Sequence, residues 1–564
     1  MVRDTLKINL SRKYHSLKLL IIALLLFLLF TNSTEKKSES FAVATRHHIA
    51  SDIGMSILEA GGNAVDAAVA VAFALSVVNP SAGNLGGGGF MLIHLAEKEE
   101  TFALDYRERA PKKSSRDMFL DDKGKVIRGL SLNSTLSSGI PGTIAGLFYA
   151  IEKFGSLEIE PLISPSIKLA REGFVLSDFQ SNNINKYKKK FLSNQDAKKI
   201  FTRSEGFKAN DLLIQEDLAN TLERILINGK KEFYSGPTSK KIIDFYKKNG
   251  GIFSQEDFQE YRVKELSPIC GTYRIYKVCS MPPPSSGGIA LIQMLNVLEN
   301  FDISKLSHNS LEYLNILIST MDYAFFDRAK YLGDPEFFAV PQNMLTSKKY
   351  AQEIFKNIRA KKPAPKANVK FLESEETTHF SIIDKWGNVV SNTYTLNTAY
   401  GSGIVPTGTG ILMNNEMDDF SLKPGFPNAY GLVGSDANKI EPRKTPLSSM
   451  SPIIVFLKNK PILISGSPGG STIITTVLQE ILNILDFGMN LEESSQQSRI
   501  HYQNLPDIVF HEELKFEIIE ELSKRKKLAK RKLGETHSIL LDNNNIEAVS
   551  DKRRPDGKAS TILQ

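Results

Sequence analysis

The chain has 564 residues, of which 41% are hydrophobic and 24% charged, so it can bury a large core of two to four domains. The formal net charge is +7, but the first 18 residues hold five Lys or Arg against one Asp, and the remainder is nearly balanced. Nothing in this charge distribution requires a nucleic-acid partner, and no repeat of about 20–50 residues indicates a solenoid.

The N-terminal residues 1–33 have the pattern of an export signal. Basic residues precede an apolar run over 19–30, which is short for a membrane span and typical of a secretory signal. No clear cleavage motif follows, so a cleaved signal peptide and a retained anchor through residues 17–30 both stay open. In either case we expect an exported protein, periplasmic or anchored to the outer face of the cytoplasmic membrane.

Helices and strands alternate in the next part of the chain. Residues 49–60 predict an amphipathic helix, and 64–78 predict a second helix that is apolar nearly all round and therefore buried. Two strand-like runs with a polar turn between them cover 89–106. A further helix is expected over 141–155, because proline begins that run and glycine ends it.

Helical runs continue over 156–355, interrupted by a predicted hairpin that carries Cys270 and Cys279. In an exported protein the two cysteines could form a disulfide if they face each other in register, and two reduced thiols are the alternative. The Lys- and Pro-rich stretch 356–370 has the composition of a linker.

Thr377 begins a strand directly after this linker. Two strand-like runs follow, separated by a turn centred near Trp386, and this hairpin would place Thr377 opposite Thr395. If the chain is cut between Glu376 and Thr377, the new N-terminal threonine carries both a hydroxyl and an amine. The reference pKa of that amine is about 8, so it can take the proton from the hydroxyl.

Strands dominate the rest of the chain, with helices between them. We expect a strand pair over 452–466, a helix over 471–488 and a final strand pair over 537–551. The basic run 524–532 is expected to be the solvated face of a helix. The pattern predicts a layered α/β protein, and because no metal-ligand spacing is evident we expect no metal and no cofactor.

Nine runs resemble, in the right order, those of the γ-glutamyltranspeptidases, which are N-terminal nucleophile hydrolases. Besides the run that holds Thr377, they are EAGGNAVDAAVAVAFALSVVNP, NLGGGGFML, LDYRERAP, MPPPSSGG, NTYTLNTAYGSG, LMNNEMDDFS, PLSSMSP and SGSPGGSTIITTVLQ. The resemblance implies a four-layer αββα sandwich made by two interwoven subunits of one self-cleaving precursor. These would be a large subunit over 34–376 and a small catalytic subunit over 377–564, associated as a heterodimer.

The resemblance also implies a reaction. The γ-glutamyl group of glutathione or a related donor would pass to the threonine hydroxyl and then to water or to an amino-acid or peptide acceptor. Thr377 would be the nucleophile, Thr395 would orient it, and the consecutive N–H groups of Gly469 and Gly470 would bind the oxyanion. Taken alone, the two glycines indicate only a tight turn.

A γ-glutamyl donor ends in a carboxylate and an ammonium group, so the pocket should hold a cation and an anion apart from each other. Arginine suits a carboxylate because its guanidinium can bind both oxygens. Arg109 and Asp418 are expected to be structural, and His47, His48 and His379 to have no catalytic role. The residues implied for the carboxylate are Arg107, Ser448 and Ser449, and those for the ammonium are Asp419, Asn397 and Glu416.

Residues 423–438 resemble the lid loop found in one branch of the family, with Tyr430 at its tip. Such a lid favours small donors such as glutathione, and a plain surface loop is the alternative.

Two rival functions remain open. A cephalosporin or glutaryl acylase would process itself in the same way, but Asp419 would have no ammonium group to bind. An exported binding protein with an uncut, inert Thr377 would show one chain instead of two on a denaturing gel.

Overall fold

Two β-sheets stacked face to face form the centre of the structure, a computed structural model that describes residues 40–366, 377–542 and 545–562. Ser40–Ile562 make one compact unit, while the predicted signal over 1–33 and the residue Glu376 lie outside the described residues. Side chains from both sheets fill the space between them, for example Phe90 and Leu92 from one sheet with Ile454 and Ile464 from the other. This packing follows from the two-residue period of strands, which turns alternate side chains to the same face.

Strands from distant parts of the chain build both sheets. The first sheet has the order β18 (Lys558–Ile562), β1 (Phe41–Thr45), β9 (Thr378–Ile383), β10 (Val389–Thr395), β2 (Gly88–Leu95), β3 (Glu100–Asp105), β6 (Lys264–Leu266). The second has the order β17 (Asn545–Ser550), β16 (His537–Asp542), β12 (Lys460–Ser465), β11 (Ile453–Leu457), β8 (Tyr276–Ser280), β7 (Ile269–Tyr273). Two small sheets hold β13 (Ile500–His501), β14 (Ile508–His511) and β15 (Lys527–Lys530), and β4 (Phe174–Val175) and β5 (Leu212–Leu213).

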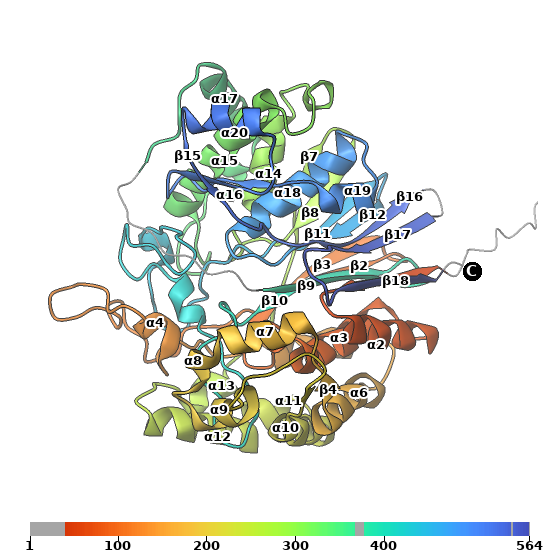
Figure 1. Cartoon of the computed structure of the whole chain (residues 1–564), viewed down its shortest axis with the longest axis vertical. Helices are drawn as coiled ribbons and strands as arrows, with labels where there is room; N and C mark the ends of the chain where they lie inside the picture. The colour runs from red at the N-terminus through yellow and green to blue at the C-terminus, as the bar shows by residue number, and fades with distance from the viewer. Residues whose placement is uncertain (1–39, 367–376, 543–544, 563–564) are drawn as a thin grey trace, which may run out of the picture. The chain divides into compact units, whose positions relative to one another are not determined.

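Helices cover the outer face of each large sheet, so the layers run α, β, β, α (Figure 1). Below the first sheet lie α2 (His48–Glu59), α3 (Ala64–Val78), α4 (Leu130–Asn133), α5 (Thr143–Phe154), α6 (Ile159–Glu172), α7 (Asp178–Lys186), α8 (Lys188–Phe191), α9 (Gln195–Phe201), α10 (Glu216–Asn228), α11 (Lys230–Tyr234), α12 (Pro237–Lys248) and α13 (Gln255–Gln259). Above the second lie α14 (Gly287–Leu298), α15 (Leu311–Tyr331), α16 (Gln342–Leu345), α17 (Lys348–Arg359), α18 (Thr472–Leu485), α19 (Leu491–Gln496) and α20 (Phe516–Ser523). Short 3-10 turns occupy η1 (Ile303–Lys305), η2 (Glu416–Asp419) and η3 (Asp436–Asn438).

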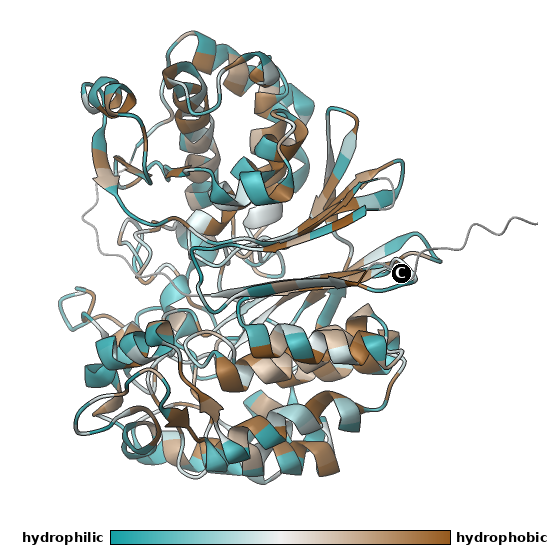
Figure 2. Cartoon of the chain, turned by 45° about the vertical axis from the view of Figure 1, so that its right-hand side comes forward, coloured by the Kyte–Doolittle hydropathy of each residue, from teal (hydrophilic) through white to brown (hydrophobic). Residues whose placement is uncertain are grey.

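The sequence pattern explains why α3 is the most deeply buried helix of the first layer. Each of its residues is buried, and it packs between β9 and β10 on one side and α5 and α6 on the other. Asn63 caps its N-terminus, and the Asp66 carboxylate accepts a hydrogen bond from the backbone N–H of Asn63. Figure 2 shows how hydropathy is distributed over the layers, with hydrophobic residues along the strands and hydrophilic ones on the outer sides of the helices.

None of the described helices combines the length and apolar character that a membrane crossing needs.

Most predicted elements are confirmed, and three expectations are wrong. The run 524–532 is not a helix: α20 ends at Ser523, and Lys527–Lys530 form β15, which pairs in parallel with β14. The linker begins later than predicted, because α17 continues to Arg359. The pair β16 and β17 does not end the fold, since β18 follows and pairs with β1 at the edge of the first sheet.

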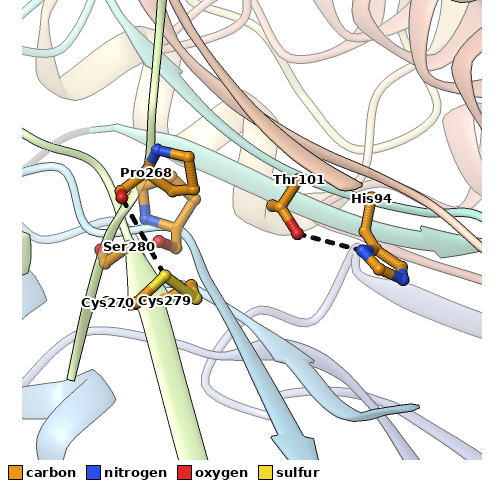
Figure 3. Close-up of a disulfide and its surroundings, with 7 residues drawn as sticks. His94, Thr101, Pro268, Cys270, Cys279 and Ser280 are labelled. Carbon is orange, nitrogen blue, oxygen red and sulfur yellow. Dashed lines mark hydrogen bonds between the residues drawn. A yellow bond between two sulfur atoms is a disulfide. The ribbon is translucent and has the colours of Figure 1, made fainter. Parts of the chain in front are cut away.

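Cys270 and Cys279 form a disulfide that joins β7 to β8 (Figure 3). The two residues are direct partners in the antiparallel register, with Cα atoms 4.1 Å apart. The open question of bridge or thiols is therefore answered in favour of the bridge.

Replacing both cysteines by alanine should lower the free energy of unfolding by about 1–3 kcal/mol, because the open chain regains conformational freedom in the unfolded state. Urea unfolding followed by circular dichroism measures this change. Chemically reduced wild-type protein should match the double variant, and equal stability of the variant and the oxidised protein would contradict the prediction.

Candidate active site

Thr377 lies directly before β9, opposite Thr395 on β10. The register pairs Thr378 with Tyr394 and Ile383 with Val389, so one further step places Thr377 across from Thr395. The two hydroxyl oxygens are 3.4 Å apart, and each residue is 3% exposed. The hairpin geometry expected from the sequence is therefore confirmed.

Two further contacts hold this pair in place. Arg46 donates from Nη1 to the carbonyl oxygen of Thr377 at 2.6 Å, and the Thr395 hydroxyl accepts the backbone N–H of Asn397 at 2.9 Å. Asn397 has a φ of +75°, which turns the chain sharply after β10. Both threonines are thus fixed by backbone hydrogen bonds at the end of a central hairpin.

One small cavity contains the threonine pair and most of the residues that the sequence indicated. Its walls are made by Arg107, Thr377, Thr395, Asn397, Glu416, Asp419, Tyr430, Leu432, Ser448, Ser449, Met450, Gly470 and Ile473. Gly469 does not line this cavity and instead lines a neighbouring cleft. The cavity volume is about 20 Å³, which leaves room for roughly one water molecule.

Arg107 occupies the centre of the charged side of the cavity. Its Nη1 lies 2.8 Å from Glu416 Oε1, its Nη2 lies 2.6 Å from Asp419 Oδ2, and its Nε donates to the carbonyl of Pro446. Burial alone would lower the pKa of Arg107, but the carboxylates of Glu416 and Asp419 raise it above the ordinary value. The guanidinium is therefore charged.

The expectation of a cation and an anion held apart is wrong for this structure. Arg107 and Asp419 are in direct contact, because a guanidinium that is 1% exposed needs acceptors close to it. Burial raises the pKa of Glu416 well above its ordinary range despite the neighbouring Arg107. Burial likewise raises the pKa of Glu108 to about 8.

Gly469 and Gly470 precede helix α18, as the sequence predicted. Their φ angles are +128° and +57°, values that favour glycine, and the Gly469 carbonyl accepts the N–H of Thr472 at 3.0 Å. The positive end of the helix dipole points to this turn. A Cβ atom at Gly470 would lie 2.3 Å from the ring of Tyr430, so the tyrosine packs directly on the glycine.

The loop 423–438 is held over the cavity. Tyr430 is 4% exposed, and its hydroxyl donates to the carbonyl of Asn397. Asp418 accepts the N–H of Ala429 at 2.7 Å and the hydroxyl of Ser131 at 2.6 Å, and so ties the loop to the body. Burial raises the pKa of Asp418 to about 7. A plain surface loop is excluded, because Tyr430 is itself part of the cavity wall.

Two arginines near the site were missed by the sequence analysis. Arg328, on α15, donates from Nη2 to the Ser449 hydroxyl at 3.1 Å, and burial lowers its pKa to about 10. Arg46 binds the backbone of Thr377, as described above. The sequence offered only a weak indication of Arg328, because it is one charged residue on a side of helix α15 that is otherwise apolar.

The remaining residues singled out in the sequence lie away from the cavity. His379 is fully buried, contacts Thr393 and Ser381, and burial lowers its pKa well below the ordinary value. His47 caps helix α2, and Arg109 lies over the ring of Tyr261.

Known proteins resemble this chain along nearly its whole length. The family model described as gamma-glutamyltranspeptidase matches residues 50–561. The glutathione hydrolase proenzyme of Escherichia coli (strain K12) is 46% identical over 530 residues, which cover 91% of this chain and 90% of that protein.

Solved structures agree with the fold. The γ-glutamyltranspeptidase of Helicobacter pylori is 45% identical, with a TM-score of 0.55 over 57% of this chain and 92% of that one. The cephalosporin acylase of Bacillus halodurans is 24% identical, with a TM-score of 0.81 over 93% of this chain and 96% of that one, and so shows the shared fold alone.

Proposed function

This chain belongs to the gamma-glutamyltranspeptidase family, and from that premise we propose that it is a self-processing glutathione hydrolase and γ-glutamyltransferase whose nucleophile is Thr377. One observation carries the assignment of the site. The Thr377 hydroxyl shares a single buried cavity with Thr395, Gly470, Arg107 and Asp419. A nucleophile, an oxyanion donor, a cation and an anion are the groups that transfer of a γ-glutamyl group requires.

Processing would come first. The Thr377 hydroxyl attacks the carbonyl carbon of Glu376, and the acyl group moves from nitrogen to oxygen, which leaves an ester and a free amine. Water hydrolyses the ester, so that Glu376 ends in a carboxylate and Thr377 regains its hydroxyl. Thr377 then carries both a free amine and a hydroxyl, so the amine can act as the base for the hydroxyl of the same residue.

Transfer would then use the same hydroxyl. The amine takes the proton as the oxygen attacks the γ-amide carbon of the donor, and N–H groups at Gly469 and Gly470 stabilise the oxyanion. The donor amine leaves with the proton, and the γ-glutamyl ester on Thr377 passes to water or to an acceptor amine. Thr395, 3.4 Å away, orients the hydroxyl throughout.

The α-amino acid end of the donor would bind at the charged side of the cavity. Arg107, with Ser448 and Ser449, binds the carboxylate, while Asp419 binds the ammonium with help from Asn397 and Glu416. Binding must separate Arg107 from Asp419, which are in contact at 2.6 Å. The donor supplies one opposite charge to each of them, so both charges stay compensated.

Asp419 favours a γ-glutamyl donor over a glutaryl or cephalosporin substrate. Asp419 lines the cavity and pairs with Arg107, so a substrate without an α-amine would leave the Asp419 carboxylate with no cation once Arg107 turned to the substrate. Burying an unpaired charge is costly. The geometry therefore supports γ-glutamyl donors and not dicarboxylic ones.

The two subunits would stay associated after cleavage as a heterodimer of residues 34–376 and 377–564. Strands from both sides of Thr377 alternate in the sheets: β9 pairs with β1 and β10 pairs with β2, while β11 pairs with β8. Residues 1–33 would direct export to the periplasm or anchor the protein at the membrane. Amino acids and small peptides would be the acceptors.

Intact mass of the purified protein tests this proposal, combined with hydrolysis of γ-glutamyl-4-nitroanilide. We expect two chains, the smaller beginning at Thr377, and release of nitroaniline only from the cleaved form. A single uncut chain without activity would support a binding protein. Cleavage of glutaryl anilide in preference to γ-glutamyl anilide would support an acylase.

Gly470→Ala should lower kcat by about a hundredfold. The added Cβ would lie 2.3 Å from the Tyr430 ring, and a φ of +57° strains any L side chain, so the turn and its N–H groups must shift. Steady-state kinetics with γ-glutamyl-4-nitroanilide measures the effect. Gly488→Ala is the matched control, since Gly488 has a φ of +66° but no atom within 4 Å of the added Cβ. Equal losses in both variants would show that backbone strain alone is responsible.

A further inference from the structure

A second, much larger cavity adjoins the nucleophile pocket. Its volume is about 820 Å³, and its wall includes Pro468 and Gly469, while the next residue, Gly470, lines the pocket that holds Thr377. Arg46 also lines the second cavity and donates to the Thr377 carbonyl. We call this second cavity the basic cleft. The basic cleft therefore meets the nucleophile pocket at the turn 469–470, and its Arg46 contacts the backbone of the nucleophilic residue.

Cationic side chains outnumber carboxylates among the described residues that line the basic cleft. Among its described lining residues, Glu535 is the one carboxylate, and Arg46 holds it at 2.6 Å. Burial would raise the pKa of Glu535, but Arg46 and Arg554 outweigh that effect and lower it to about 2. Six cationic residues line the cleft: Arg46, Lys186, Arg531, Lys532, Arg553 and Arg554.

The cleft also has the uncharged surfaces that a short peptide needs. Phe179 and Tyr187 contribute rings, and Asn182 and Asn183 contribute amide groups. Lys186 and Lys532 are exposed, and the Lys532 ammonium donates to the carbonyl of Arg553, another residue of the cleft wall. Several hundred Å³ is the size of ordinary small-molecule sites, so a dipeptide fits well within this volume.

We propose that the basic cleft binds the part of the substrate beyond the scissile amide nitrogen, and that it selects peptides with a free carboxylate there. This inference rests on the proposed function. The amine that leaves the donor and the amine that attacks the ester pass through the same position, because the second half of the reaction reverses the first. One cleft therefore serves the leaving group of glutathione and the peptide acceptor, both of which carry a carboxylate.

Two donors that differ by one carboxylate test the inference on the processed protein. γ-Glutamyl-3-carboxy-4-nitroanilide carries the charge on its leaving group, and γ-glutamyl-4-nitroanilide does not. In the double variant Lys186→Gln, Lys532→Gln the ratio of kcat/KM for the charged donor to that for the neutral one should fall about fivefold, since partly screened charges are lost. Added salt should reduce the same ratio in the wild type.

The control variant is Lys189→Gln, Lys527→Gln, which removes two exposed lysines that are close in sequence but do not line the cleft. Its donor ratio should equal that of the wild type. Glycylglycine and glycylglycinamide, compared as acceptors with the neutral donor, separate the two sources of the carboxylate. If the double variant changes only the ratio for the donors, the cleft binds the leaving group. If it changes the ratio for the acceptors as well, the cleft also binds the acceptor.

The inference would be overturned if the lysine double variant were active and its kcat/KM ratios of charged to neutral donor and of charged to neutral acceptor equalled those of the wild type. The same ratios would also have to stay unchanged after Arg531→Gln is added. This outcome would leave the proposed function intact. A processed wild-type protein that cleaves neither anilide would instead count against the proposed function, and the inference would fall with it.

Discussion

Thr377→Ala should yield a single uncut chain with no detectable γ-glutamyl transfer. The alanine has no hydroxyl to attack the carbonyl of Glu376, so the amine that would serve as base is never released. Loss of a nucleophile typically lowers kcat by at least about a thousandfold, and here the loss of processing adds to it. Denaturing gels and intact mass report the cut, and γ-glutamyl-4-nitroanilide reports the activity.

The neighbouring threonine provides a matched control. Thr378 is fully buried, and its hydroxyl makes no hydrogen bond within the described part of the chain, so Thr378→Ala should still be cut and remain active. Thr377→Ser keeps a hydroxyl and should process slowly. A cut and active Thr377→Ala protein would exclude Thr377 as the nucleophile.

Arg107→Met should raise KM for γ-glutamyl donors about a hundredfold or more, because the cation that binds the donor carboxylate is lost. The variant should also unfold more easily, by about 3–5 kcal/mol, since Glu416 and Asp419 would remain buried without the guanidinium. Steady-state kinetics and urea unfolding measure the two effects separately.

Arg109→Met is the control for this prediction. Arg109 is two residues away and only partly buried, it lies over the ring of Tyr261, and it does not line the cavity. Its loss should change KM less than about threefold, in line with a single partly exposed cation–π contact. If Arg107→Met bound the donor normally, the carboxylate site would have to be elsewhere.

The β9–β10 hairpin shows why part of the site was predictable. Antiparallel pairing with a short turn relates each residue to its partner by simple counting, so Thr377 and Thr395 could be paired from the turn alone. The cysteine register on β7 and β8 follows the same rule, but whether the thiols were oxidised could not be read from the spacing.

The run 524–532 shows where such counting fails. Its composition is typical of a solvated helix, yet β14 offers an open edge in this part of the fold, and Lys527–Lys530 pair with it. Sheet pairing satisfies the backbone groups, while two of the lysine side chains remain exposed at the surface. Arg531 then places its guanidinium over the ring of Phe510, a contact between residues 21 positions apart.

The residues of the charged cluster could be named from the sequence, but the contacts among them could not be predicted. Arg107 and Asp419 were assigned separate roles because a γ-glutamyl group carries two charges, and the structure brings them to 2.6 Å. The reason is burial: in a cavity of about 20 Å³ the two groups neutralise each other in place of water. Arg328 escaped notice because only the packing of α15 against the serine turn brings it to Ser449.

The sequence by itself determined the local properties of this protein: the helix and strand periods, the hairpin that pairs Thr377 with Thr395, the glycine turn before α18 and the family. These depend on residues close together in the chain, where spacing alone sets the geometry. Only the tertiary structure decided which charges meet, that the loop with Tyr430 closes on Gly470, and that a basic cleft adjoins the nucleophile. Those contacts join residues tens to hundreds of positions apart, and only the packing of the two sheets and their helices brings them together.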